Sequence, residues 1–307
     1  MKYQYTIIIP HFNIPRLLRR CLWSIPKRDD TQVIVVDDRS SDENIAELKK
    51  LEADYTYVTF IYSSENGGGG RARNIGLMHA LGEYVLFADA DDFFNYCLDD
   101  ILDKYQEEIC DVVFFNARYV DTDTYLDTNR CPAINILMRK YKKTHNTEEL
   151  KYLFGEPWCK LIRRNFLEVN NIRFDSTPIH NDTTFSYMVG FHSKSVKVDN
   201  IGLYCLADRT NSVSKVISES NLLTRVKVFS KKNRFLRENN IPFFDYQMIT
   251  SFEIFILRGD YENLKKCFDI ASEYGFSKPS VCLKLIKYEL GRVIHKMFTI
   301  VTIRLWY

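Results

Sequence analysis

The sequence predicts an α/β fold in which a mixed, mostly parallel sheet is flanked by helices, followed by a helical C-terminal region. Two observations predict it. Over the first 120 residues, short apolar runs alternate with segments whose apolar residues repeat at helical spacing. This alternation is typical of parallel strands joined by helical crossovers, which bury both faces of the sheet. From residue 218 onward only helical patterns remain, so we expect an all-helical appendage there.

The predicted strands are short runs rich in Val, Ile and aromatic residues, as expected of strands buried on both faces. Five lie in the first part of the chain, at 6–9, 33–36, 58–61, 84–87 and 112–115. Two more follow, at 158–162 and 196–206. Together they predict one large sheet.

The predicted helices carry apolar residues three and four positions apart. They cover 17–25, 45–51, 72–79 and 163–170, and then 222–238, 252–257, 264–274 and 281–298. Ser40 and Glu43 have the spacing of a capping box before the second helix. Residues 118–147 are polar and irregular, and we predict no regular element there.

The composition excludes several classes of protein. Of 307 residues, 46% are hydrophobic and 27% charged, and Gly and Pro number only 12 and 8, which excludes collagen-like and largely disordered chains. A net charge of +2 gives no support for nucleic-acid binding. The eight cysteines form no Cys-x-x-Cys pair, so we expect reduced thiols rather than a zinc or redox site.

We expect a cytoplasmic location, with membrane contact at most on the surface. No targeting segment is recognisable, and no stretch reaches the roughly 18 to 20 apolar residues of a spanning helix. Residues 283–307 interleave basic and apolar side chains and include Trp306. Such a helix could lie in the headgroup region of an anionic membrane or dock on the protein, and both interpretations stay open.

Polar residues follow four of the predicted strands, at 10–13, 37–41, 66–74 and 89–92. In an open parallel sheet, ligands bind beyond the carboxyl ends of the strands. Asp89, Asp91 and Asp92 come directly after a strand, where adjacent anions repel one another unless a cation compensates them. Mg²⁺ or Mn²⁺ would supply that charge, although one of these residues could instead cap the next helix.

Glycines 67–70 are four in succession. Because glycine costs chain entropy in regular structure, the run predicts unusual backbone angles or close approach of a ligand, with a plain flexible connector as the alternative. Arg71 and Arg73 follow at a predicted helix start, where phosphate or a base could bind. The run matches neither a Walker loop nor a dinucleotide fingerprint.

In their order and spacing, the segments 6–13, 35–42, 65–76 and 82–92 together resemble the family 2 glycosyltransferases. Weaker signatures follow at 158–164, 171–175 and 180–185, and the resemblance fades beyond residue 215. It implies a GT-A-like, Rossmann-type catalytic domain over 1–215, with a nucleotide-sugar half at 1–120 and an acceptor half at 121–215. Residues 216–307 form the helical C-terminal region.

The resemblance also implies roles for residues of the first half. Pro10 and Phe12 line the pocket for the nucleotide base, Asp38 hydrogen-bonds that base, usually uracil, and Arg73 closes the pocket. Asp91 coordinates a Mn²⁺ or Mg²⁺ ion that bridges the two phosphates, while Asp89 holds the ribose or assists the metal. The full donor-binding set is Pro10, Phe12, Asp38, Asn66, Gly67, Arg73, Asp89 and Ala90.

In the second half, Asp182 falls where the family places its catalytic base. The family usually has an acidic residue directly before that base, whereas this chain has Asn181. Asn181 and Trp158 are candidates for the acceptor side, and Trp158 could equally pack in the core. Among the remaining candidates, His11 is a pocket wall and Arg209 is part of a loop over the diphosphate. His180 is either a hydrogen-bonding neighbour of the site or a ligand of the metal.

The predicted activity is inverting transfer of a sugar from a UDP-sugar to a hydroxyl of a glycan acceptor. By resemblance the acceptor is lipid-linked and belongs to a bacterial capsule, O-antigen or exopolysaccharide. One alternative is transfer to a polyprenyl phosphate, although that subgroup tends to lack the Trp-x-Lys and Asn-Asp segments found here. Another is a catalytically silent nucleotide-sugar-binding scaffold. An oligomer, for example a homodimer through the C-terminal helices, is a hypothesis without a motif.

Overall fold

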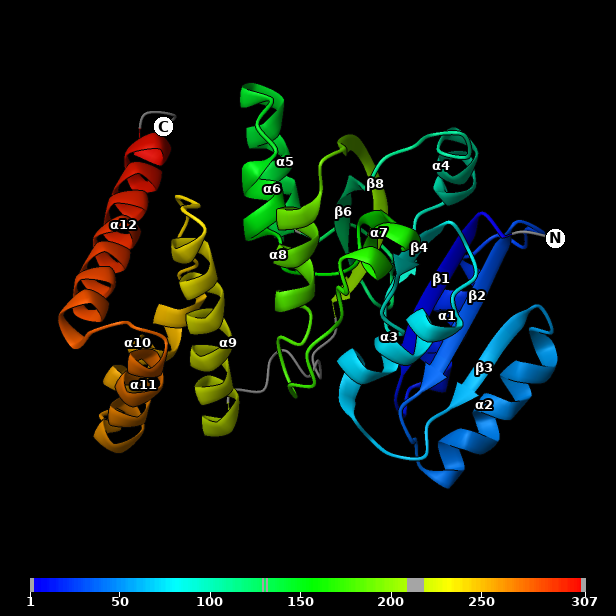
Figure 1. Ribbon diagram of the computed structural model, residues 1–307, viewed down its shortest axis with the longest axis horizontal. Helices are drawn as coiled ribbons and strands as arrows, with labels where there is room; N and C mark the ends of the chain where they lie inside the picture. The colour runs from blue at the N-terminus through cyan, green and yellow to red at the C-terminus, as the bar shows by residue number, and fades with distance from the viewer. Residues whose placement is uncertain (1–2, 129, 131, 209–217, 305–307) are drawn as a thin grey trace. The chain divides into compact units, whose positions relative to one another are not determined.

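The computed structural model describes residues 3–128, 130, 132–208 and 218–304, with side chains as far as residue 292. The chain divides into two compact units, Met1–Ser212 and Val213–Tyr307. Figure 1 shows that the first unit holds the sheet and the second consists of helices. Within the described residues no helix is both long enough and apolar enough to cross a bilayer.

The sheet has eight strands in the order β3-β2-β1-β4-β7-β6-β8-β5. Their bounds are β1 Tyr5–His11, β2 Thr31–Asp37, β3 Val58–Tyr62, β4 Tyr84–Phe87, β5 Phe93–Phe94, β6 Val112–Asp121, β7 Lys160–Arg163 and β8 Val196–Asp208. Strands β3, β2, β1 and β4 are parallel to one another, as are β6 and β8. β7 is antiparallel to β4 and β6, and β5 is antiparallel to β8. The predicted mixed, mostly parallel sheet is confirmed.

Helices of the first unit cover both faces of the sheet. They are α1 Pro15–Trp23, α2 Asp42–Asp54, α3 Gly68–His79, α4 Leu98–Lys104, α5 Ala133–Thr144, α6 Glu148–Leu153, α7 Arg164–Val169 and α8 Thr183–His192. Val33 and Val35 of β2 pack in one cluster with residues of α1 and α2, whereas Ile34 and Val36 pack with Ala72 and Ile75 of α3. Alternate side chains of one strand thus face opposite layers, which explains its continuously apolar sequence.

Two local expectations are wrong. The predicted capping box does not form, because helix α2 follows Ser41 and Ser40 Oγ instead donates to Asp37 Oδ1 at 2.5 Å. Residues 118–147 are not irregular throughout, since β6 extends to Asp121 and α5 covers Ala133–Thr144. Helix α5 buries Ile134 and Met138 and packs Leu137 and Tyr141 against the core, so its apolar residues do recur at helical spacing within this otherwise polar stretch.

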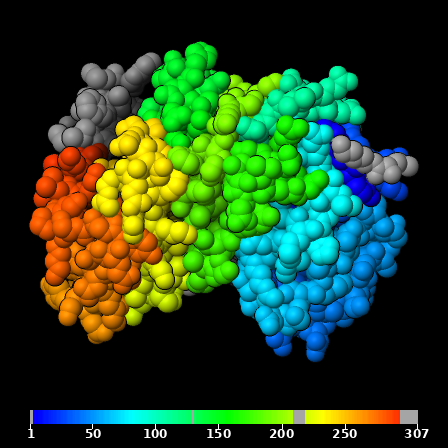
Figure 2. All heavy atoms as spheres, viewed as in Figure 1, coloured from blue at the N-terminus to red at the C-terminus, as the bar shows by residue number. Residues whose placement is uncertain are grey.

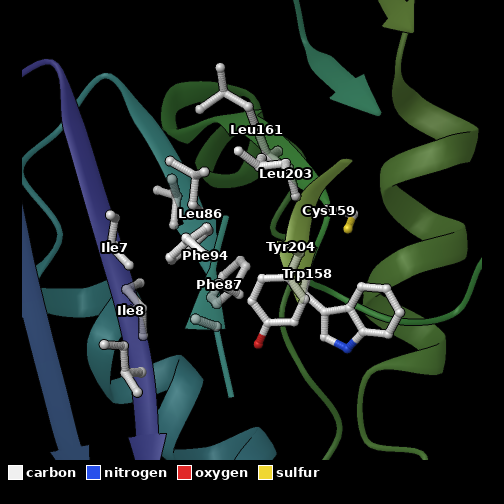
Figure 3. Packing of buried hydrophobic residues seen from close by; sticks show 14 of the residues in the cluster. Ile7, Ile8, Leu86, Phe87, Phe94, Trp158, Cys159, Leu161, Leu203 and Tyr204 are labelled. Atoms are coloured by element: carbon white, nitrogen blue, oxygen red, sulfur yellow. The ribbon is translucent and has the colours of Figure 1, made fainter. Parts of the chain in front are cut away.

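The two sequence halves of the first unit share one core. The main cluster joins β1 and β4 to residues beyond 150, including Trp158, Leu161 and Tyr204 (Figure 3). In the space-filling view the blue-to-cyan and green segments pack directly against each other (Figure 2). A ligand that contacts both halves therefore meets a preformed scaffold.

In the second unit, all regular elements among the described residues are helices, as predicted. It contains α9 Glu219–Glu238, α10 Gln247–Arg258, α11 Tyr261–Glu273 and α12 Lys278–Arg304. Its own core includes Phe229, Phe252 and Phe255. Lys232 is buried there and pairs with Asp245 at 2.6 Å, so the unit compensates its buried charge internally.

Candidate functional site

The predicted site residues of the first half gather at one edge of the sheet. Strands β1, β2, β3 and β4 are parallel, so their carboxyl ends meet at that edge. Phe12 follows β1 and is 47% exposed, and Pro10 lies half-buried within that strand. An exposed aromatic ring at this edge is suited to stacking on a planar base.

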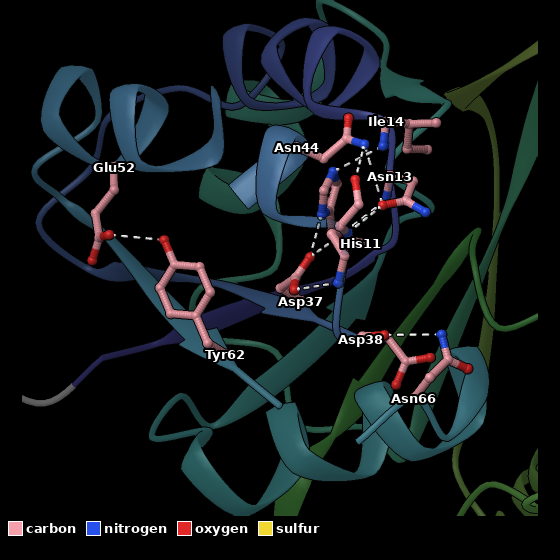
Figure 4. Close-up of polar contacts among 11 residues, drawn as sticks. His11, Asn13, Ile14, Asp37, Asp38, Asn44, Glu52, Tyr62 and Asn66 are labelled. Carbon is pink, nitrogen blue, oxygen red and sulfur yellow. Dashed lines mark hydrogen bonds and ion pairs between the residues drawn. The ribbon is translucent and has the colours of Figure 1, made fainter. Parts of the chain in front are cut away.

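A buried polar network supports the end of β1. His11 is 2% exposed, and its Nδ1 lies 2.8 Å from Asp37 Oδ1 (Figure 4). The Ile14 amide donates to His11 Nε2 at 3.2 Å, so the ring proton is on Nδ1 and is donated to Asp37. Burial alone raises the pKa of Asp37, but hydrogen bonds from His11 and Ser40 outweigh it and hold that pKa below its usual value. His11 is therefore a structural residue rather than a pocket wall.

Asp38 joins the end of β2 to the glycine segment. Its Oδ1 accepts from the Gly67 amide at 2.8 Å and its Oδ2 from the Gly68 amide at 2.6 Å. The side chain of Asn66 donates to the Asp38 carbonyl oxygen at 3.0 Å (Figure 4). A buried carboxylate thus accepts from two amides at the N-terminus of α3, an arrangement that favours negative charge.

Gly68, Gly69 and Gly70 lie in the helix rather than before it, and Gly67 is its N-cap residue. α3 begins at Gly68, whose φ of +79° is in the region that favours glycine. A Cβ on Gly70 would lie 2.3 Å from the Asp175 carbonyl oxygen and 2.8 Å from Asn181 Cβ. The glycine run thus allows a close approach, as predicted, but here part of that approach is between two segments of the chain. Helix α3 packs directly against the segment before α8.

We expect Gly70→Ala to destabilise the protein by about 1–3 kcal/mol, because the added methyl group meets backbone rather than a flexible side chain. The matched control is Gly155→Ala, whose Cβ would have nothing within 4 Å and which should change stability by less than about 0.5 kcal/mol. Urea unfolding of both variants tests this. Equal stability of the two variants would contradict the packing described here.

Arg73 connects the two halves of the first unit. It is buried, and its Nη2 donates to Asp89 Oδ1 at 2.5 Å while its Nη1 donates to Asn181 Oδ1 at 3.0 Å. Its guanidinium carbon also lies 5.4 Å from the centre of the Phe174 ring. The predicted donor-side residues Arg73 and Asp89 are thus brought together with the acceptor-side residue Asn181.

The acid turn, residues 89–92, follows β4. One carboxylate oxygen from each of Asp89, Asp91 and Asp92 lies within 4.8 Å of the others. Asp92 is buried, and burial together with the charges of Asp91 and Asp89 raises its pKa well above the usual value. Ala90 packs into the main core. Three converging carboxylates, two of them partly exposed, match the hard oxygen ligands that Mg²⁺ and Mn²⁺ prefer.

Asp182 precedes α8 but does not cap it through its side chain. Its pKa is raised, mainly by burial; the positive charge of Arg73 opposes this shift and the negative charge of Asp89 adds to it. The capping explanation for this residue is therefore not supported. A carboxylate whose pKa is raised, close to the donor-side residues, is a candidate general base.

Trp158 packs inside the protein. It is 7% exposed and stacks on Tyr204, with ring centres 5.5 Å apart and an angle of 10° between the planes. This favours the packing alternative for Trp158. Tyr204 in turn accepts from the Asp89 amide at 2.8 Å, and its hydroxyl group lowers the pKa of Asp92 in opposition to the larger effect of burial. Sequence reasoning missed Tyr204 because it lies inside an ordinary apolar strand.

Lys160, two residues beyond Trp158, is a buried ammonium group. It donates to the Glu156 carbonyl oxygen at 2.5 Å and to Ser186 Oγ at 3.0 Å. Ser186 lies one turn of α8 beyond Asp182.

The predicted loop around Arg209 lies outside the described residues. His180 is not part of the described acid cluster. In the described part of the C-terminal helix, Leu283, Ile286 and Leu290 are exposed.

Comparison with known proteins identifies a matching family and relatives that are similar in sequence. The family described as Glycosyl transferase family 2 matches residues 6–170. Glycosyltransferase GlyA of Streptococcus pneumoniae serotype 4 is 26% identical over 247 residues, which are 77% of this chain and 35% of GlyA. Poly(ribitol-phosphate) beta-N-acetylglucosaminyltransferase TarS of Staphylococcus aureus is 30% identical over 181 residues, 56% of this chain and 29% of TarS. The chain thus spans only part of the length of both relatives.

Solved structures share the fold. Residues 1–349 of S. aureus TarS in complex with UDP-GlcNAc match with a TM-score of 0.63 and 20% identity, over 94% of this chain and 92% of that one. Mannosyltransferase PcManGT from Pyrobaculum calidifontis, in complex with GDP-Man and Mn²⁺, matches with a TM-score of 0.56 and 16% identity, over 94% and 81%. At these identities the likeness shows the fold alone.

Proposed function

Since this chain belongs to the family 2 glycosyltransferases, we propose that it transfers a sugar from a UDP-sugar to a hydroxyl group of a glycan acceptor with inversion. The observation that carries the proposal is the meeting of donor-side and acceptor-side groups at one place. Arg73 contacts both Asp89 of the acid turn and Asn181, the neighbour of Asp182. The candidate binding residues and the candidate base therefore lie near one another, which supports the proposal.

The donor side of the mechanism follows from the chain's own groups. Phe12, exposed after β1, is placed to stack on the base, and Asp38 with the Gly67 and Gly68 amides borders the same edge. Asp91 and Asp89 would hold Mn²⁺ or Mg²⁺, and a bound divalent cation neutralises charge on a departing diphosphate. UDP is the proposed nucleotide because TarS, which shares the fold, is solved with UDP-GlcNAc.

On the acceptor side, Asp182 takes the proton of the acceptor hydroxyl as its oxygen bonds to the anomeric carbon. The bond from that carbon to the diphosphate oxygen breaks in the same step, and UDP leaves with the electron pair. Asn181, held by Arg73, borders the acceptor. We further propose a bacterial surface polysaccharide as the product and a lipid-linked glycan as the acceptor, which would place the protein at the inner face of the membrane. The name of TarS, a poly(ribitol-phosphate) beta-N-acetylglucosaminyltransferase, supports a polymeric acceptor.

The test is donor hydrolysis by the purified protein, which needs no acceptor. UDP-, GDP-, CMP- and dTDP-sugars are compared with Mn²⁺, with Mg²⁺ and with a chelator present. We expect release of UDP from one UDP-sugar, dependent on the added metal. A folded protein that binds none of these nucleotides would overturn the proposal and favour the scaffold alternative.

A further inference from the structure

We propose that Tyr204 is a positioning residue, whose hydroxyl group sets the geometry of the acid turn and thereby its affinity for a divalent cation. This inference rests on the proposed function, because it concerns how the same site binds its metal. Tyr204 lies on β8, more than a hundred residues along the chain from the turn that it contacts.

Strand β8 contacts both ends of the four-residue turn. At the first end, the Asp89 amide donates to Tyr204 Oη at 2.8 Å. Further along β8, the Ala207 amide donates to Asp92 Oδ1 at 2.9 Å. The turn is thus bound to β8 at its first and last residues, which leaves Asp91 between two fixed points.

The ring that carries this hydroxyl is held on several sides. Tyr204 is fully buried. Trp158 stacks on its ring, and Phe94 packs against it in an edge-to-face arrangement with the ring centres 5.5 Å apart. Figure 3 shows the indole beside the phenol ring, with the hydroxyl oxygen pointing toward the end of the sheet where the arrow of β1 finishes. Close packing on these sides restricts the ring, so the direction of its hydroxyl group is fixed.

A fixed support matters here because the turn carries like charges. The carboxylates of Asp89, Asp91 and Asp92 converge within 4.8 Å, and their mutual repulsion favours a wider spacing of the turn. A hydroxyl that accepts from the Asp89 amide holds the first residue of the turn in place against this spreading, so less rearrangement is needed when a cation binds.

The test is Tyr204→Phe, which removes the hydroxyl group and keeps the ring. Free Mn²⁺ is measured by electron paramagnetic resonance during titration of the protein, with and without UDP. We expect Mn²⁺ affinity to fall about tenfold to a hundredfold, the usual effect of losing a hydrogen-bonding support behind a metal site. Binding at the wild-type affinity would overturn the inference.

Tyr105→Phe is the matched control. The Tyr105 hydroxyl donates to Asp199 at 3.1 Å, and this tyrosine is also buried in the first unit and packed edge-on against Phe115. Its loss removes a similar buried hydrogen bond but leaves the acid turn untouched. We expect both variants to melt at lower temperature and only Tyr204→Phe to bind Mn²⁺ more weakly. Equal weakening in both variants would show a general loss of stability and overturn the inference.

Two further outcomes separate this inference from the proposed function. If the wild type binds Mn²⁺ and Tyr204→Phe binds it more weakly, but the wild type binds no nucleotide-sugar, the inference stands and the proposed function falls. If Tyr204→Phe does not fold, Trp158→Leu removes the stacked ring while the hydroxyl group stays. We expect weaker Mn²⁺ binding in that variant as well, and wild-type affinity there would overturn the inference.

Discussion

Asp91→Asn is expected to fold normally and to lose about a thousandfold or more of its transfer rate. Asp91 lies in the middle of the acid turn, where its carboxylate and those of Asp89 and Asp92 converge within 4.8 Å. A cation held there contributes several kcal/mol to the stability of the departing diphosphate, and about 1.4 kcal/mol corresponds to a factor of ten in rate. The amide keeps the size of the side chain but removes its charge. The measurement is the rate of UDP release at saturating donor and metal.

Asp100→Asn is the control for this variant. Asp100 is exposed in the first turn of α4 and undergoes the same chemical change outside the acid turn. It should retain the wild-type rate and Mn²⁺ affinity. An Asp91→Asn variant that keeps both as well would exclude Asp91 as a metal ligand.

The second large effect is expected for Asp182→Asn. This variant should bind UDP like the wild type but lose about 10²- to 10⁴-fold in the rate of transfer to an acceptor, the usual contribution of a general base. Asp182 makes no side-chain cap for α8, so its loss leaves the helix N-terminus as it was. The comparison of UDP affinity with transfer rate distinguishes loss of a base from loss of the pocket. Equal losses in UDP affinity and in transfer rate would favour a structural role for Asp182.

The raised pKa of Asp182 gives this role a pH dependence. Burial raises that pKa, so Asp182 is protonated at pH values where an ordinary Asp is already ionised. The rate of transfer should therefore fall as the pH is lowered, with a midpoint above the usual Asp pKa of about 3.9, and Asp182→Asn should not show this decrease.

The raised pKa of Asp182 also affects stability, because the folded state binds this proton more tightly than the unfolded state does. Ionised Asp182 thus opposes folding as the pH rises, and Asp182→Asn should melt at a higher temperature at neutral pH.

The sequence predicted the parallel strands well because their signal is local. Val33 and Val35 face one helical layer while Ile34 and Val36 face the other, so β2 is recognisable from its own residues. The acid turn and Asp38 were placed at the same edge of the sheet for a similar reason, since parallel strands end together. Helix α5 was missed although its apolar residues have helical spacing, because the segment around them is rich in polar and charged residues.

Side-chain partners were harder to predict, because they depend on contacts between distant parts of the chain. Ser40 had the spacing of a helix cap, yet it bonds to Asp37 and to the Asn13 amide. Nothing local indicated that Tyr204 would lie beneath the acid turn. Sequence motifs identified which residues gather at the site, and tertiary structure decided which of them contact one another.

The contact between α3 and the segment before α8 has a consequence for chimeras built from relatives. Asn74 exchanges two hydrogen bonds with the backbone of Phe174, at 3.0 and 2.9 Å, while Gly70 leaves no room for a side chain beside Asn181. In a chimera that exchanges acceptor preference between relatives, residues 174–181 must come from the same parent as α3, because these two segments fit each other. A crossover near residue 120 would separate these partners, so the two halves of the first unit are inherited as a matched pair.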